Sequence, residues 1–275
     1  MDRIFKQAII MMVFVLLIGG VSFGIYQLVR VEPTCTDNIQ NQGEMGIDCG
    51  PVCGNLCAPQ ILSLVVEATT LLSAGDGNYD AVTRVDNPNI SYGSSLVQYA
   101  LVLQDDTGAE LVRYPGSFFI GPGRNRLVVQ NLSSVPGKPA QAQLVISDVQ
   151  WQKVNVSETL PVEFSVRRES FTSPNRAGVT HRYEGVLYND SDFDFARVDV
   201  VVVLSDDTGT IAGIGQTNVN TFLSQTERYF SVQWSKLIPQ KITDIHVEAL
   251  TDLFENENFI KRYGTQEEFQ NYYPE

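Results

Sequence analysis

The chain has 275 residues, of which 43% are hydrophobic and 19% are charged, and its formal net charge at pH 7 is −13. This acidic balance argues against nucleic acid as a partner, because nucleic-acid binding depends on Lys and Arg side chains that neutralise phosphates. An acidic exterior instead keeps a protein soluble and unattached to anionic surfaces.

An uncharged and almost wholly apolar stretch runs from Gln7 to Val29. It exceeds the roughly 20 residues that a helix needs to cross a ~30 Å hydrocarbon core. The alternative is a cleaved signal peptide, which has an apolar core of about 7–15 residues before a small-residue cleavage site. This run is longer and has no Ala-x-Ala site, so we expect a retained transmembrane helix over residues 7–29, preceded by a cytoplasmic stub over residues 1–6.

Basic residues at the start of the chain predict the orientation of this helix. Arg3 and Lys6 favour an N-terminus in the cytoplasm, which gives a single-pass membrane protein with extracytoplasmic C-terminal domains. Within the span, Gly20 and Gly24 match the small-xxx-small pattern that lets membrane helices pack closely. These two glycines are a candidate helix-packing surface, although glycine is common in such helices anyway.

All four cysteines follow the predicted helix within one short window: Cys35, Cys49, Cys53 and Cys57. A clustered, even number of cysteines beside a membrane segment predicts two disulfides in an oxidising compartment. Four cysteines allow three pairings, and the sequence does not choose among them. Zinc is the alternative, but structural zinc sites usually use Cys-x-x-Cys spacing, whereas both short spacings here are Cys-x-x-x-Cys. We expect residues 33–58 to form a small disulfide-rich segment, called the collar below.

Oxygen-bearing side chains lie between these cysteines. Asp37, Asn41, Glu44 and Asp48 could supply ligands to calcium, which prefers six to eight oxygens in a flexible loop. The alternative is that Asp, Asn and Gly form turns here, as they commonly do. Calcium at this loop is the one cofactor that the sequence suggests.

The collar resembles a motif common in secreted and surface proteins of bacteria, Cys-x-Asp-x-Ile-x-Asn-x-x-Glu-x-Gly-x-Asp-Cys-Gly. The match begins at Cys35 and extends to Cys57. The chain departs from the motif at Asn38 and Pro51, where glycine is usual, and at the spacing of the last two cysteines. The resemblance implies a disulfide-bonded segment of a bacterial surface protein.

The remaining chain, about 245 residues, is long enough for one large or two ordinary domains, and it carries signs of duplication. Leu103-Gln104-Asp105-Asp106-Thr107-Gly108 recurs as Leu204-Ser205-Asp206-Asp207-Thr208-Gly209. Each copy follows a strand with period-two alternation, with Val97, Tyr99, Leu101 and Leu103 matched by Val198, Val200, Val202 and Leu204. The separation of about 100 residues is the size of an immunoglobulin-like sandwich.

Short alternating strands separated by turn residues predict an all-β ectodomain. We expect two tandem immunoglobulin-like β-sandwiches over residues 60–154 and 160–254, followed by a polar C-terminal tail over residues 255–275. The Asp-Asp-Thr-Gly tetrads should form hairpin turns in which Gly108 and Gly209 take a positive φ. Outside the predicted span we see no helical periodicity, apart from isolated turns near residues 252–261.

Both copies contain the same order of features, which is Asn-Pro-Asn or Asn-Asp-Ser, then an alternating strand, then Leu-x-Asp-x-x-Gly. This pattern resembles the FxLYD-type domains, which are immunoglobulin-like modules on many microbial surface proteins. The resemblance covers roughly residues 62–154 and 162–252, and it concerns the fold more than any activity. The eponymous motif is not cleanly present, and Tyr183–Asn189 is the nearest approach to it.

We find no catalytic motif in the sequence. His181 and His246 fit ordinary strand positions, and no Gly-x-Ser-x-Gly, phosphate-binding loop or His-Glu-x-x-His occurs. We therefore predict a non-enzymatic, membrane-anchored surface protein that presents its sandwiches for adhesion, envelope scaffolding or protein–protein interaction. A protein partner is expected at the sandwich loops, of which Pro136–Pro139 is a candidate. The alternatives are a rigid stalk, a subunit of a surface or secretion assembly, and more remotely a metal-dependent enzyme.

Overall fold

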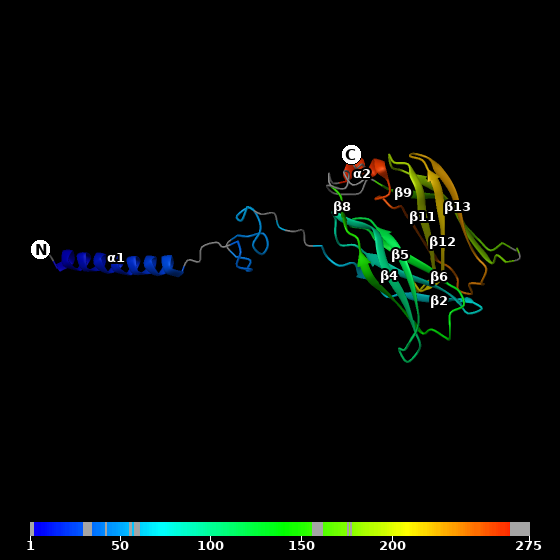
Figure 1. Cartoon of the computed structure of the whole chain (residues 1–275), viewed down its shortest axis with the longest axis horizontal. Coiled ribbons are helices and arrows are strands. Elements are labelled where there is room, and N and C mark those ends of the chain that lie inside the picture. The colour runs from blue at the N-terminus through cyan, green and yellow to red at the C-terminus, as the bar shows by residue number, and fades with distance from the viewer. Residues whose placement is uncertain are drawn as a thin grey trace. The chain divides into compact units, whose positions relative to one another are not determined.

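The computed structural model describes residues 3–29, 35–41, 43–54, 57, 61–155, 162–174, 176 and 178–264 (Figure 1). The chain divides into two compact units, Met1–Gln60 and Ile61–Glu275. The first contains an apolar helix and the collar, and the second contains the β-sandwiches. The fold class expected from the sequence is therefore confirmed.

Helix α1 runs from Arg3 to Val29 and contains the apolar segment Ile9–Gln27, with a mean hydropathy of 2.5. None of that segment is buried by other parts of the protein. A helix that is apolar on every face needs either a protein core or a bilayer around it. By length and composition α1 could anchor the protein in a membrane. Gly20 and Gly24 leave open space on its surface, since an added Cβ would meet no atom within 4 Å.

The first sandwich stacks two antiparallel sheets. In one, β3 (Asn78–Asp86) pairs with β6 (Asn125–Leu132) on one side and with β1 (Val65–Val66) and β2 (Thr70–Gly75) on the other. In the other, β4 (Tyr92–Gln104) lies between β5 (Glu110–Ile120) and β7 (Gln141–Val149), and the short β8 (Gln152–Lys153) also pairs with β4.

The second sandwich has the same pairing pattern. One sheet has the order β13 (Glu227–Trp234), β10 (His181–Asn189), β9 (Phe164–Thr172), and the other has the order β12 (Ile211–Phe222), β11 (Phe195–Ser205), β14 (Asp244–Leu250). Thus β9-β10-β13 corresponds to β2-β3-β6, and β12-β11-β14 corresponds to β5-β4-β7. Duplication of one ancestral unit would produce this shared pairing of strands. Duplication itself stays a prediction.

The alternating residues predicted to face inward do form the two cores. Each core has one inward row on its central strand: Val97, Tyr99, Leu101 and Leu103 in the first, and Val198, Val200, Val202 and Leu204 in the second. All eight side chains are at most 7% exposed. Burial of such apolar rows between two sheets is the main force that holds a sandwich together.

Both Asp-Asp-Thr-Gly tetrads form the expected turns. In the second, Asp206 Oδ1 accepts hydrogen bonds from Thr208 N at 2.9 Å, Thr208 Oγ1 at 2.7 Å and Thr210 N at 3.0 Å. Asp105 makes the same three contacts in the first turn. Gly108 and Gly209 take φ values of 84° and 79°, as predicted. These hydrogen bonds lower the pKa of both Asp105 and Asp206.

Part of the segment predicted as a polar tail is instead a helix. Helix α2 runs from Glu257 to Tyr263 and is capped by Asn256, whose side chain accepts a hydrogen bond from Phe259 N at 2.9 Å. Phe259 and Ile260 are 0% and 5% exposed in the core of the second sandwich. Seven residues make only two helical turns, too few for a clear periodicity in the sequence. The rest of the predicted tail, from residue 265, lies outside the described residues.

The two sandwiches contact each other through sheet faces and edges. Strands β12 and β14 lie against the first sandwich, β12 beside β2, β3 and β6, and β14 beside β6. Gln216 Nε2 on β12 donates to Asn131 Oδ1 on β6 at 2.8 Å. After β8, Asn155 N donates to Tyr263 O at 2.7 Å, so the end of the first sandwich is tied to α2.

Candidate functional site in the collar

The collar contains two disulfides, Cys35–Cys53 and Cys49–Cys57, with Cα–Cα distances of 5.6 Å and 4.8 Å. The prediction of two disulfides is confirmed, and the structure supplies the pairing that the sequence left open. A sulfur bound to another sulfur is no thiolate ligand, so this oxidised collar does not offer the cysteine ligands that structural zinc requires.

Two glycines are required by close approach inside the collar. A Cβ on Gly46 would lie 2.9 Å from Cys49 Sγ and 3.2 Å from Cys57 Sγ. Gly50 has φ 119°, and its Cβ would lie 2.9 Å from Met45 N. Glycine at position 46 therefore lets the backbone pass close to the sulfurs of the Cys49–Cys57 bridge, and glycine at position 50 lets it pass close to the Met45 backbone.

The carboxylate of Asp48 accepts backbone hydrogen bonds from the start of the collar. Its Oδ1 accepts a hydrogen bond from Asp37 N at 3.0 Å, and its Oδ2 accepts one from Asn38 N at 2.9 Å. Asn38 takes φ 58°, a left-handed conformation that Asn tolerates better than most residues.

Asp37 and Asn41 continue this network. Asp37 Oδ1 accepts from Ile39 N at 2.9 Å, and Asn41 Nδ2 donates to Asp37 Oδ2 at 3.0 Å. Asn41 Oδ1 is buried, and none of the residues that the structure describes gives it a hydrogen bond.

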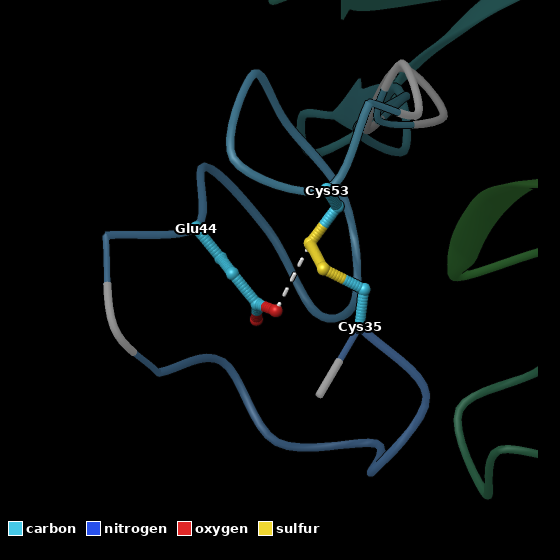
Figure 2. A group of neighbouring side chains, drawn as sticks. All are labelled: Cys35, Glu44 and Cys53. Atoms are coloured by element: carbon cyan, nitrogen blue, oxygen red, sulfur yellow. Dashed lines mark hydrogen bonds between the residues drawn. A yellow bond between two sulfur atoms is a disulfide. The ribbon is translucent and has the colours of Figure 1, made fainter. Parts of the chain in front are cut away.

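Glu44 is the buried acid of the collar, only 7% exposed. Its Oε2 accepts hydrogen bonds from Asn41 N at 3.3 Å and Asp48 N at 3.2 Å. Its Oε1 lies 3.2 Å from Cys53 Sγ, and Figure 2 shows the carboxylate directed at the Cys35–Cys53 bridge. Because a disulfide sulfur carries no hydrogen, this contact is not a hydrogen bond while the bridge is closed.

The four residues predicted to bind calcium all lie in this one network, but their carboxylates do not converge as a set. Among the described residues, the acidic, cysteine and histidine side chains whose ligand atoms lie within 4.8 Å of one another are Cys35, Glu44 and Cys53. Asp37 and Asp48 use their oxygens on backbone and side-chain N–H groups of the loop. Calcium stays a prediction.

The two histidines lie in the second sandwich, on strands of different sheets. His181 is 8% exposed, its Nε2 accepts from Ile238 N at 3.2 Å, and its Nδ1 lies 3.0 Å from Ser173 Oγ. A ring that accepts at Nε2 is neutral and carries its proton on Nδ1, which then donates to Ser173. His246 is exposed on β14.

Sequence reasoning missed the polar contacts between the sandwiches. Arg126 Nη2 on β6 pairs with Asp199 Oδ2 on β11 at 3.0 Å, and the Arg126 guanidinium lies 3.8 Å from the centre of the Phe119 ring. Glu248 Oε1 on β14 accepts from Leu127 N at 2.7 Å. Burial raises the pKa of Glu248. These residues meet only because the two sandwiches dock in one particular arrangement. No local sequence pattern predicts that arrangement.

A groove of about 740 Å³ lies beside this interface. It runs along β12 and β13, reaches Leu72–Ala74 of β2, and is bridged by Lys236, whose Nζ donates to Ser73 O. The candidate contact loop Pro136–Pro139 lies elsewhere on the first sandwich, where Pro136, Gly137 and Lys138 are exposed.

Comparison with known proteins adds no family. No family model matches the chain, and no curated protein matches it. Among solved structures, red sea bream transglutaminase matches with a TM-score of 0.21 and 11% identity, over 73% of this chain and 30% of that one. A β-glucuronidase of glycoside hydrolase family 2 matches with a TM-score of 0.18 and 10% identity, over 63% of this chain and 24% of that one. The chain thus spans less than a third of either structure.

Proposed function

We propose that this protein is a non-enzymatic, single-pass membrane protein that displays two packed immunoglobulin-like sandwiches outside the cytoplasm. The observation that carries the proposal is a pair of disulfides that begins shortly after an apolar helix of membrane-spanning length. Structural disulfides form and persist in oxidising compartments, so the chain beyond the helix belongs on the outer side of a membrane. The resemblances to bacterial surface proteins and to FxLYD-type modules support the same placement.

The role proposed for the sandwiches is adhesion, envelope scaffolding or another protein–protein interaction. Loops that project from a rigid sandwich commonly carry recognition, and Pro136–Pro139 is such a loop. The contacts of Arg126 with Asp199 and of Glu248 with Leu127 N would hold the two sandwiches as one display unit. The same cross-links favour, as a second candidate, a rigid structural subunit of a surface assembly.

Engineered cysteines test the placement directly, because all four native cysteines are paired. Asn220→Cys lies on an exposed position of β12, and Lys6→Cys lies before the apolar segment. In intact cells we expect a membrane-impermeant maleimide to label Asn220→Cys and to label Lys6→Cys only after permeabilisation. The reverse pattern would contradict the proposed orientation.

Photo-crosslinking tests the proposed interaction. A photoreactive amino acid at exposed Lys138 should give a covalent adduct with one protein partner, while the same group at exposed Asn220 should not. Identical adducts at both positions, or none at Lys138, would argue against recognition by this loop.

A further inference from the structure

The collar carries its large hydrophobic side chains on its surface. Among the described residues of the collar these side chains, called the apolar set below, are between 53% and 74% exposed: Ile39, Met45, Ile47 and Val52. Glu44, by contrast, is buried, and its carboxylate is directed at the Cys35–Cys53 bridge (Figure 2). A single exposed hydrophobic residue is ordinary, but a small segment that exposes several together marks a surface that contacts a protein or a membrane.

Two members of the apolar set lie on adjoining parts of the collar backbone. A Cβ at Gly50 would lie 3.2 Å from Met45 Cβ, and Val52 Cγ2 lies 4.0 Å from the Cβ position of Gly43. Val52 is also next to the Cys35–Cys53 bridge, whose Cα–Cα distance is 5.6 Å. This disulfide therefore brings Val52 back to the start of the collar, the end that follows α1 along the chain.

The other two members of the apolar set are linked through Asp48. Asn38 N donates to Asp48 Oδ2 at 2.9 Å, Ile39 follows Asn38 in the chain, and Ile47 precedes Asp48. The apolar set is thus attached to a backbone that two disulfides and this hydrogen bond constrain. Burying side chains on a constrained backbone costs less conformational entropy than burying them on a flexible one.

The bilayer proposed for α1 is within reach of the collar. Helix α1 ends at Val29, and Cys35 follows six residues later. Even a fully extended chain of that length spans only about 22 Å. The interfacial layer on each side of the hydrocarbon core is itself about 5–8 Å thick. A short tether of this kind holds the collar at a high effective concentration beside the membrane surface, so weak contacts suffice.

The charge of the collar decides which part of the bilayer it can contact. Residues 35–57 contain three carboxylates, on Asp37, Glu44 and Asp48, and no Lys or Arg. Anionic headgroups attract clusters of basic residues, which are absent from this sequence. What remains is the hydrophobic effect, which depends on the apolar area removed from water and needs no lipid charge.

We propose that the collar lies on the bilayer and that the apolar set enters the interfacial layer beside α1. The partner is the glycerol and upper acyl region of the lipid, held by hydrophobic contact and without any requirement for anionic headgroups. This inference rests on the proposed function, because it takes α1 to span a membrane. It goes further by giving the collar a role, which is to fix how the chain leaves the lipid.

Tryptophan fluorescence in brominated lipid tests the proposal. The full-length chain is reconstituted in phosphatidylcholine vesicles whose acyl chains carry bromine either near the headgroup or near the chain end, and bromine quenches tryptophan only at close range. Met45→Trp places a probe in the apolar set, and Ile18→Trp places one in the middle of the apolar segment of α1. The emission of the unmodified protein, from Trp151 and Trp234, is subtracted, and the non-reduced mass verifies both disulfides.

We expect bromine near the headgroup to quench the Met45→Trp probe more strongly than bromine near the chain end, with emission shifted to shorter wavelength. The Ile18→Trp probe should show the opposite depth preference. Phosphatidylglycerol, an anionic lipid, should not strengthen the quenching of the Met45→Trp probe. Stronger quenching in that lipid would contradict a contact that is purely hydrophobic.

Matched double variants test whether the apolar set makes the contact. In the Met45→Trp background, Ile47→Asn with Val52→Asn should lose most of the quenching by bromine near the headgroup. Ile47→Leu with Val52→Ile, which keeps the apolar area, should retain it. Equal quenching in the two double variants would overturn the proposal.

The two probes distinguish failure of this inference from failure of the proposed function. Quenching of Ile18→Trp without quenching of Met45→Trp would overturn the collar contact and leave the membrane anchor intact. A Met45→Trp emission that is shifted to shorter wavelength but not quenched would show that protein, and not lipid, covers the apolar set. Absence of quenching at both probes would overturn both the anchor and the collar contact.

Unmodified protein provides a second measurement if Met45→Trp does not form both disulfides. The full-length chain is irradiated in vesicles that contain phosphatidylcholine with a photoreactive group in the upper acyl chain, and its peptides are analysed by mass spectrometry. We expect lipid adducts within residues 35–57 as well as within α1. Adducts in α1 without any in residues 35–57 would overturn the proposal.

Discussion

A buried asparagine holds the loops at one end of each sandwich. Asn189 is fully buried, and its Nδ2 donates to Phe193 O at 2.8 Å and to Leu223 O at 3.1 Å. In the first sandwich Asn87 Nδ2 donates to Tyr92 O at 2.7 Å and to Gly121 O at 2.9 Å. In both cases one buried side chain donates to carbonyl groups of two separate segments and so links them.

Removing this side chain should destabilise the second sandwich. We expect Asn189→Ala to lower the free energy of unfolding by about 1–3 kcal/mol, because the Ser191 amide loses its acceptor and the carbonyls of Phe193 and Leu223 each lose one donor. Exposed Asn220→Ala should change it by less than about 0.5 kcal/mol. Denaturant unfolding followed by the fluorescence of Trp234, in a Trp151→Phe background, measures both. Equal effects of the two substitutions would contradict the role given to Asn189.

Helix α2 closes the open end of the second sandwich. Phe259 packs edge-on against Phe193, with ring centres 5.7 Å apart, and Phe254 from the preceding turn packs over Gly93 of the first sandwich. A Cβ at Gly93 would lie 2.7 Å from the Phe254 ring, so glycine is required there. The segment after β14 thus belongs to the core and also contacts the neighbouring sandwich.

Replacing Phe259, the buried aromatic residue of α2, with a smaller residue should destabilise the second sandwich. We expect Phe259→Ala to destabilise the second sandwich by about 3–5 kcal/mol, in the range for deletion of a buried Phe, and Phe259→Leu to cost clearly less. Thermal unfolding monitored by Trp234 fluorescence measures the difference. If Phe259→Ala unfolds with wild-type stability, α2 does not pack as described.

The strands of this protein were predictable, whereas α2 and the contacts between the sandwiches were not. Period-two alternation identified Val198–Leu204 as a core strand because backbone geometry forces alternate side chains onto one face. The Asp206–Gly209 turn was predictable because its chemistry is local. By contrast, α2 has too few residues for a periodicity, and Arg126 and Asp199 are brought together only by docking of two domains.

The same distinction holds for the collar. Clustering of the cysteines predicted both disulfides, but loop closure alone does not choose among three pairings. Glu44 was singled out as an oxygen ligand, and its position against Cys53 Sγ depends on the pairing of Cys35 with Cys53. The contact could therefore not be derived from spacing.

Across the whole molecule, two half-buried acids, Glu248 and Asp252, link stability to pH. Burial raises the pKa of Asp252 to about 6, and neighbouring Glu255 adds to the effect. Because the folded state holds this proton more tightly than the unfolded state, the stabilisation is complete at low pH and is lost as pH rises through about 6. Glu248, whose pKa is also raised, acts in the same direction.

Replacing Asp252 should remove its part of this dependence. We expect Asp252→Asn, which keeps an oxygen for Phe254 N, to be more stable than the original chain at pH 7.5 by up to about 3 kcal/mol. At pH 3, below the ordinary pKa of an aspartate, the two should be nearly equal. Denaturant unfolding at the two pH values checks this, and a constant difference at both would contradict a titrating Asp252.

The central claim is that one chain keeps its apolar helix and carries an oxidised collar and folded sandwiches beyond it. The most direct measurement is the intact mass of the protein purified from the membrane fraction of a bacterial host, without reducing agent. We predict a mass that includes Gln7–Val29 and is lower by four hydrogens, one pair for each of Cys35–Cys53 and Cys49–Cys57. A chain that begins after Val29, or one with four free thiols, would contradict the account.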